Sequence, residues 1–107
     1  MLHLTSETFE IEAARGNLPV LVMFYAAWCS KCAMMKPMIE DLEPAYRGKI
    51  RFCEVDIEEC EDLAECYGTD IIPTFVILKG GKTLSTFRGV FSEQSFRNHL
   101  QEIFRNC

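Results

Sequence analysis

Six consecutive apolar residues, Val20 to Tyr25, place a strong constraint on the architecture of this chain. A strand with no polar face has to be covered on both sides, as in the centre of a sheet that lies between layers of helices. The run is rich in strand-forming residues, and a helical pattern follows it closely. It therefore predicts the central strand of a layered α/β domain.

Four helical patterns surround this strand. The longest places Met35 and Met38 on one face and contains Pro37, which predicts a kink because proline removes a backbone donor. Ser6 is the expected N-cap of the first helix. The expected helices cover residues 6–16, 30–46, 58–67 and a last segment from 92 onward, whose apolar face is Phe96, Leu100, Ile103 and Phe104.

The remaining strand patterns predict a mixed sheet. Strands separated by helices indicate right-handed parallel crossovers, and a glycine pair between two strand patterns indicates an antiparallel hairpin. We therefore expect an α/β fold with a parallel core and an antiparallel C-terminal hairpin, flanked by helices, in a single domain over residues 1–107. The further strands are expected at Leu2–Leu4, Ile50–Ile57, Thr74–Leu78 and Thr83–Arg88, with Gly80-Gly81 as the turn.

The composition is that of an ordinary soluble globular domain, because the 107 residues are 49% apolar and 25% charged. A formal net charge of −5 with scattered Lys and Arg argues against nucleic-acid binding. The first residues lack a secretory signal pattern, and the longest apolar run, Leu18 to Trp28, is too short to cross a membrane. We therefore expect a cytoplasmic protein that binds neither nucleic acid nor membranes.

The motif Trp28-Cys29-Ser30-Lys31-Cys32 lies where the central strand gives way to the long helix. Cys29 then sits at a helix N-terminus, where free N–H groups and the helix dipole favour a thiolate, and Cys32 lies one turn inside. Thiol–disulfide exchange needs an attacking thiolate and a second thiol that releases the mixed disulfide. The motif predicts Cys29 as the attacking thiol and Cys32 as the resolving thiol.

The other cysteines do not complete a metal site. Zinc would need a second pair at ligand spacing, and on a helix Cys60 and Cys66 point in different directions, so we expect no metal and no bound cofactor. A disulfide scaffold is disfavoured because the core is ample. Cys53 fits a small buried residue, Cys60 and Cys66 fit either packing or redox regulation, and Cys107 is a candidate for intermolecular disulfides.

Together with residues further along the chain, this motif resembles the thioredoxin family from about Leu4 to Ile103. The stretch from Phe52 to Cys60 is most similar to animal-type thioredoxins. The matching points, in order after the apolar strand, are Trp28-Cys29, Cys32, Lys36-Pro37, Glu54-Val55-Asp56, Ile72-Pro73-Thr74, Gly80-Gly81 and Gly89.

The resemblance implies a general protein-disulfide reductase that acts on disulfide-containing proteins as a monomer and is recycled by an NADPH-linked thioredoxin reductase. It implies a cis Ile72-Pro73 peptide that faces Cys29, with the Ile72 backbone free to pair with an extended substrate segment. Trp28 and Gly89 would border the same groove, although Trp28 taken alone fits a packed core aromatic equally well.

Two departures from the family pattern affect the expected mechanism. The family usually has Gly-Pro between the cysteines, whereas this chain has Ser30-Lys31. The positive charge of Lys31 would tune the ionisation of Cys29 and make the disulfide more oxidising. Alternatively, Lys31 is an exposed lysine without effect. Met23 stands where the family commonly has a buried Asp that helps to deprotonate the resolving cysteine. Glu54 is a substitute proton acceptor if it points inward, and otherwise an ordinary exposed strand residue.

Two other functions remain compatible with the residues. A protein-disulfide-isomerase-like oxidase or isomerase domain is favoured by Lys31 and disfavoured by the lack of a signal pattern. A redox-switched binding module without catalysis is disfavoured by the intact Cys-x-x-Cys motif and its expected cis-proline partner.

Overall fold

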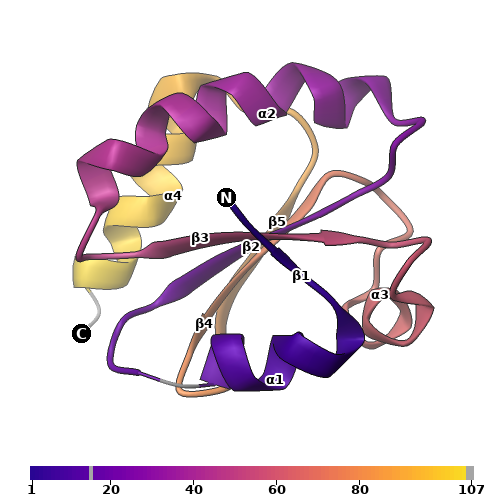
Figure 1. Cartoon of the computed structure of the whole chain (residues 1–107). Coiled ribbons are helices and arrows are strands. Elements are labelled where there is room, and N and C mark those ends of the chain that lie inside the picture. The colour runs from indigo at the N-terminus through magenta and orange to yellow at the C-terminus, as the bar shows by residue number, and fades with distance from the viewer. Residues whose placement is uncertain (15, 106–107) are drawn as a thin grey trace.

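The computed structural model of the chain describes residues 1–14 and 16–105, which form a five-stranded sheet with helices on both faces (Figure 1). The strand order is β1-β3-β2-β4-β5. The elements are β1 (Leu2–Leu4), α1 (Ser6–Ala14), β2 (Val20–Tyr25), α2 (Ser30–Leu42), a 3₁₀ turn η1 (Glu43–Tyr46), β3 (Arg51–Asp56), α3 (Glu61–Tyr67), β4 (Thr74–Lys79), β5 (Lys82–Arg88) and α4 (Glu93–Arg105).

Strand β2 is the central strand, as its sequence predicts. It pairs in parallel with β3 on one side and antiparallel with β4 on the other, so the sheet is mixed. The parallel pair β1–β3 and the antiparallel hairpin β4–β5 complete it. Val20, Val22 and Phe24 face one layer, and Leu21 and Met23 face the other. All five are buried, which confirms the prediction of a strand covered on both faces.

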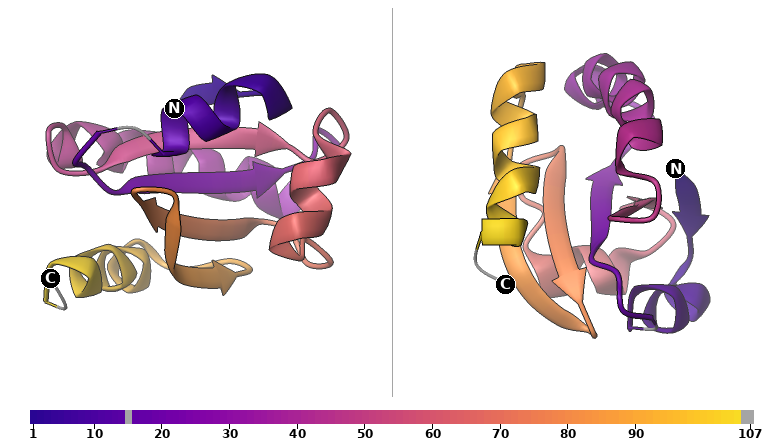
Figure 2. Two further views of the ribbon diagram at one scale, coloured as in Figure 1. Left: turned by 90° about the horizontal axis from the view of Figure 1, so that it is seen from below. Right: turned by 90° about the vertical axis from the view of Figure 1, so that its left-hand side faces the viewer.

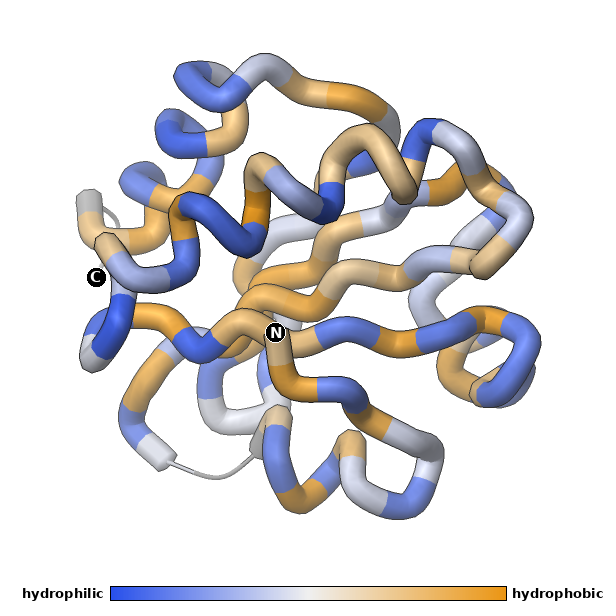
Figure 3. The backbone as a smooth tube through the Cα atoms, turned by 45° about the horizontal axis from the view of Figure 1, so that its top comes forward, coloured by the Kyte–Doolittle hydropathy of each residue, from blue (hydrophilic) through white to orange (hydrophobic). Residues whose placement is uncertain are grey.

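The helices cover the two faces in pairs (Figures 1 and 2). Helices α2 and α4 cover one face, where Ile39, Phe96 and Leu100 pack in the core. Helices α1 and α3 cover the other face, where Phe9 and Ala13 are buried. Figure 3 shows the apolar positions running along the central strands, while the helices carry many hydrophilic positions on their outer sides. The layered architecture places the end of β2 and the start of α2 at one edge of the sheet.

The start of α1 differs from the prediction, because Ser6 is not the N-cap. The Thr5 N–H donates to Thr8 Oγ1 at 2.9 Å, and the Thr8 N–H donates to Thr5 Oγ1 at 3.3 Å. This reciprocal pair caps the first turn. Ser6 is instead the first helical residue, and its hydroxyl donates to the Asp62 carboxylate at 2.7 Å.

Two helices are shorter than their sequence patterns suggest. Helix α2 ends at Leu42 and continues as the 3₁₀ turn, at whose start Pro44 lacks the N–H that an α-helix would need. Helix α3 begins only at Glu61, because the Glu58 N–H donates to the Asp56 carboxylate at 2.9 Å and closes a turn. Local side-chain bonds and a proline therefore end helical patterns that periodicity alone extends.

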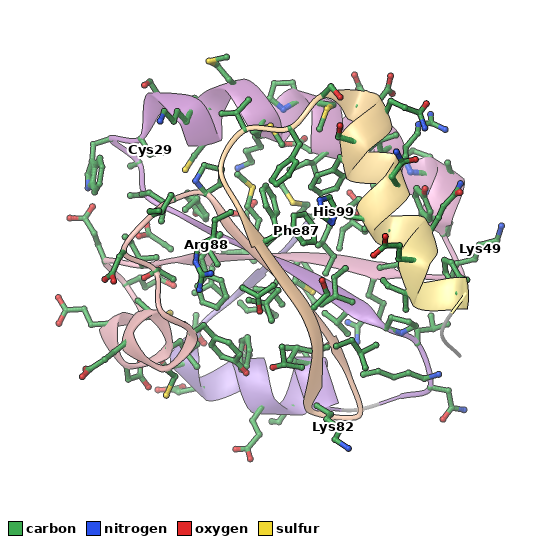
Figure 4. All side chains as sticks on the ribbon, turned by 180° about the vertical axis from the view of Figure 1, so that it is seen from behind. Cys29, Lys49, Lys82, Phe87, Arg88 and His99 are labelled. Atoms are coloured by element: carbon green, nitrogen blue, oxygen red, sulfur yellow. The ribbon has the colours of Figure 1, made fainter. Side chains whose placement is uncertain are left out.

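An aromatic cluster lies between α4 and the sheet. Phe75 and Phe87 stack with ring centroids 5.3 Å apart, and Phe96 contacts both rings edge-on. His99 stacks on Phe87 with ring centroids 4.2 Å apart (Figure 4). Phe91 meets the His99 ring edge-on at 5.0 Å. The cluster anchors α4 to the sheet.

Phe96 and Phe104 share a predicted apolar face, but the structure separates them. Phe96 is fully buried, whereas Phe104 is 46% exposed. We expect Phe96→Ala to lower the free energy of unfolding by about 3–5 kcal/mol, because it opens a cavity in the aromatic cluster. Phe104→Ala is the matched control and should cost less than about 1 kcal/mol. Urea denaturation of both variants measures the difference, and equal losses would contradict this packing.

Candidate active site

The two motif cysteines lie at the start of α2. Cys29 is the N-cap residue, and its Sγ accepts the backbone N–H of Cys32 at 3.2 Å. A backbone N–H bond to sulfur is the interaction that a helix N-terminus provides to an anion. Cys29 is 8% exposed and Cys32 is 2% exposed, so the first thiol is the more accessible of the two. The prediction that Cys29 begins a helix is confirmed.

Burial has a strong effect on the second thiol. Desolvation raises the pKa of Cys32 to about 12, and its hydrogen bond with Cys29 acts in the same direction. At neutral pH the Cys32 thiol therefore keeps its proton. Any reaction in which Cys32 acts as a nucleophile needs a group that accepts this proton.

The loop before β4 brings the Ile72-Pro73 peptide against Cys29. The Ile72-Pro73 peptide bond is cis, as the family resemblance implies. The Cys29 thiol donates to the Ile72 carbonyl oxygen, with 3.9 Å between Sγ and O. On the other side, the Gly89 N–H donates to the Pro73 carbonyl oxygen at 2.9 Å. Three segments that are far apart in the sequence are thus linked through the cis Ile72-Pro73 peptide.

Exposed apolar side chains flank this meeting point. Trp28 is 67% exposed, so the reading of Trp28 as a packed core aromatic is wrong. Ile71 and Val90, the neighbours of Ile72 and Gly89, are 57% and 49% exposed. Met34 on α2 is exposed as well. Large apolar side chains gathered on a surface are typical of a binding site.

Glu54 points inward, so the reading of an exposed strand glutamate is wrong. It lies on β3 directly beside Met23 of β2 and is only 7% exposed. Its carboxylate pairs with Lys36 Nζ at 3.2 Å and with His3 Nδ1 at 3.0 Å. Burial alone would raise the pKa of Glu54, but the bonds to His3 and Lys36 outweigh it and hold the pKa below its usual value.

Sequence reasoning missed both partners of this carboxylate. The sequence indicates Lys36 only as part of the family pattern and assigns no role to His3. The parallel pairing of β1 with β3 places His3 beside Glu54, and the other ring nitrogen of His3 lies 3.1 Å from Glu59. The bonds to Glu54 and Glu59 raise the pKa of His3. Only the strand order could have revealed this arrangement.

A small pocket connects the dithiol with Lys36. It has a volume of about 160 Å³, and both motif cysteines and Lys36 line it together with Met23. Lys36, which lines this pocket, also forms an ion pair with Glu54. The apolar Met23 therefore stands at the pocket wall, while the nearest carboxylate comes from the adjacent strand.

The remaining cysteines lie away from this site. Cys53 and Cys60 are buried in the core beneath α1 and α3, and Cys66 is exposed. Burial raises the pKa of Cys53 to about 11. Cys107 lies outside the described residues. Within residues 1–14 and 16–105, no three His, Cys, Asp or Glu side chains are placed to hold a metal ion together.

A buried thiol beside a more accessible one that lies against a cis-proline segment is an arrangement that can exchange disulfides, which defines a thiol–disulfide oxidoreductase. Comparison with known proteins agrees with this class. The thioredoxin family profile matches residues 1–102. This chain therefore belongs to the thioredoxin family and reduces protein disulfides.

Several curated relatives are bacterial thioredoxins. Thioredoxin 1 of Nostoc is 34% identical, and the match covers 92% of each chain. The thioredoxin of Rickettsia bellii is 34% identical over 87% of this chain and 89% of its own. That of Pseudomonas aeruginosa is 32% identical over 94% and 93%. The similarity of Phe52–Cys60 to animal-type thioredoxins stays a prediction.

In the described part of the chain, no helix has the length and apolar character needed to span a membrane.

The burial of the non-motif cysteines predicts their reactivity. In the reduced protein near neutral pH, iodoacetamide should modify Cys66 and leave Cys53 unmodified. Cys53 is fully buried, and its raised pKa keeps it protonated until the pH approaches about 11. Peptide mapping by mass spectrometry after timed alkylation measures both rates. Modification of Cys53 as fast as that of the exposed Cys66 would contradict the structural role of Cys53.

Proposed function

We propose that this chain reduces protein disulfides with Cys29 as the attacking thiol and Cys32 as the resolving thiol. The observation that carries the proposal is the asymmetry of the pair. Cys29 is the more accessible thiol and lies at the helix N-terminus against Ile72, whereas Cys32 is buried and has a pKa raised to about 12. The accessible thiol is the one that a substrate disulfide can approach.

The reaction then has two steps. The Cys29 thiolate attacks one sulfur of the substrate disulfide, and the second substrate sulfur leaves as a thiolate that takes up a proton. Cys32 then loses its proton and attacks Cys29 Sγ, which breaks the mixed disulfide and releases the first substrate sulfur. The substrate gains two electrons and two protons, and Cys29 and Cys32 end as a disulfide.

The substrate would bind across the surface formed by Trp28, Ile72, Pro73 and Gly89. Support for this assignment comes from the exposed Trp28 ring and from the contact between Ile72 and the Cys29 thiol. An extended substrate segment would pair with the backbone of Ile72 in the manner of an added strand. The cis-proline would hold that backbone at the level of the reacting sulfurs.

Lys31 would tune the dithiol. It is exposed and lies between the two cysteines, so its charge would favour the thiolate of Cys29 over the disulfide. The protein would then be less reducing than a relative with Gly-Pro at these positions.

The dithiol must be regenerated after each cycle. We assign this step to an NADPH-linked thioredoxin reductase, with the chain acting in the cytoplasm as a monomer and a single domain. The electrons enter through the same two sulfurs, so the chain itself would need no bound cofactor.

Trapping tests the order of attack. Cys32→Ser leaves the mixed disulfide without a resolving thiol, so it should accumulate a covalent adduct with insulin through Cys29. Cys29→Ser is the matched control and should trap none, since the remaining thiol is buried and protonated. Non-reducing electrophoresis and mass spectrometry identify the adduct. Trapping through Cys32 would overturn the assigned roles.

We propose Glu54 as the proton acceptor for Cys32 in this second step. Its pKa lies below its usual value, so at neutral pH the carboxylate is ionised and can accept a proton. Lys36 lines the pocket with Cys32 and contacts Glu54 at 3.2 Å, which links the buried thiol to the carboxylate. The pair Lys36–Glu54 would thus substitute for the Asp that the family has at Met23.

Replacement of Glu54 tests this role. Glu54→Gln should slow resolution of the mixed disulfide at least about tenfold, because a general base is lost, and should leave the attack by Cys29 nearly unchanged. Single-turnover kinetics across pH separates the two steps.

Glu59→Gln is the control for the same chemical change, because Glu59 contacts His3 but not Lys36. Met23→Asp should restore part of the resolution rate in the Glu54→Gln background. An unchanged resolution rate in Glu54→Gln would remove Glu54 from the mechanism and leave water or a substrate group as the acceptor.

A further inference from the structure

Arg88 is the last residue of β5, directly before Gly89, and its side chain crosses to the end of α3. Its Nη2 donates to the Tyr67 carbonyl oxygen at 3.2 Å and to the Gly68 carbonyl oxygen at 3.1 Å. Its Nε donates to the same Gly68 oxygen at 3.2 Å. Figure 4 shows the side chain extending from the strand toward this helix end. No pattern in the sequence points to this contact.

The end of α3 has the features that a guanidinium group needs. The last carbonyl groups of a helix lack partners within the helix, and a positive charge beside them is favourable. Gly68 ends the helix in the left-handed conformation with φ of +67°. A Cβ at Gly68 would lie 3.4 Å from Arg88 Nη2, an ordinary contact distance, so it is the left-handed backbone that favours glycine here.

The contact bears on the substrate surface because Gly68 begins the segment that leads to the cis-proline. The chain runs from Gly68 through Ile71 and Ile72 to Pro73. At the far end of this segment, the Gly89 N–H donates to the Pro73 carbonyl oxygen at 2.9 Å. Two adjacent residues at the end of β5 therefore hold both ends of segment 68–73, one through its side chain and the other through its backbone.

We propose that Arg88 is a positioning residue for protein substrates, which holds segment 68–73 so that the Ile72 backbone is ready to pair with an extended chain. The proposal rests on the substrate-binding role proposed for Ile72. A segment that is already ordered does not have to be ordered on binding, so the affinity for a pairing chain is higher. A small disulfide that reacts with Cys29 without pairing along Ile72 does not benefit from the ordering of this segment.

The test compares two oxidants with the full-length reduced protein in single turnovers. With insulin as the protein disulfide, Arg88→Met should raise the half-saturating concentration about threefold to tenfold, since hydrogen bonds that order the segment are lost. The limiting rate should stay nearly unchanged. With dithiobis(nitrobenzoate) as the small disulfide, the rate should equal that of the unmodified protein. Arg88→Lys keeps the positive charge but at most some of the hydrogen bonds. Its half-saturating concentration for insulin should lie between those of Arg88→Met and the unmodified protein.

Lys82→Met is the matched control, because it removes the same charge from an exposed residue at the opposite end of β5 (Figure 4). It should leave both reactions unchanged. An unaltered half-saturating concentration for insulin in Arg88→Met would overturn the proposal, as would an equal loss with both oxidants. Arg88 is exposed, so both Arg88 variants should fold. If Arg88→Met does not fold, the half-saturating concentration of Arg88→Lys for insulin decides in its place. Failure of the proposed function would show differently, as no insulin reduction by the unmodified protein.

Discussion

The burial of β2 on both faces organises the whole molecule. Helices α2 and α4 cover this strand on one side, and α1 and α3 cover it on the other. The chain therefore reaches the surface only where the strand ends. Residues 26–29 then lead into α2, and Cys29 is the N-cap of that helix. The Cys29 sulfur thus lies between the end of a buried strand and the start of a helix with free N–H groups.

The same burial creates a difficulty for the second sulfur. Cys32 lies one turn into α2, above the apolar side chains of the sheet, and desolvation raises its pKa to about 12. Met23 on the strand below offers no polar group. The carboxylate of Glu54 reaches the region from β3 and is kept ionised by its partners on α2 and β1. A polar cluster assembled from three elements thus lies beside an apolar one.

The proposed substrate surface depends on contacts between segments with no regular structure. The cis-proline segment has Cys29 on one side and Gly89 on the other, and its start is held by Arg88. Loops supply the contacts, while the strand β5 and the helix α3 supply the rigid ends. Such an arrangement presents backbone groups of Ile72 with little freedom left to lose.

The sequence alone determined the layered sheet, its central strand and the position of both motif cysteines, because hydrophobic period and the Cys-x-x-Cys spacing are local signals. Helix ends were less predictable, since the Thr5–Thr8 bonds and Pro44 act through local chemistry that periodicity ignores. The cis bond followed from family resemblance and not from the residues themselves. The partners of Glu54, the exposure of Trp28 and the contacts of Arg88 were decided only by the tertiary structure, because each joins elements whose relative placement depends on strand order and packing.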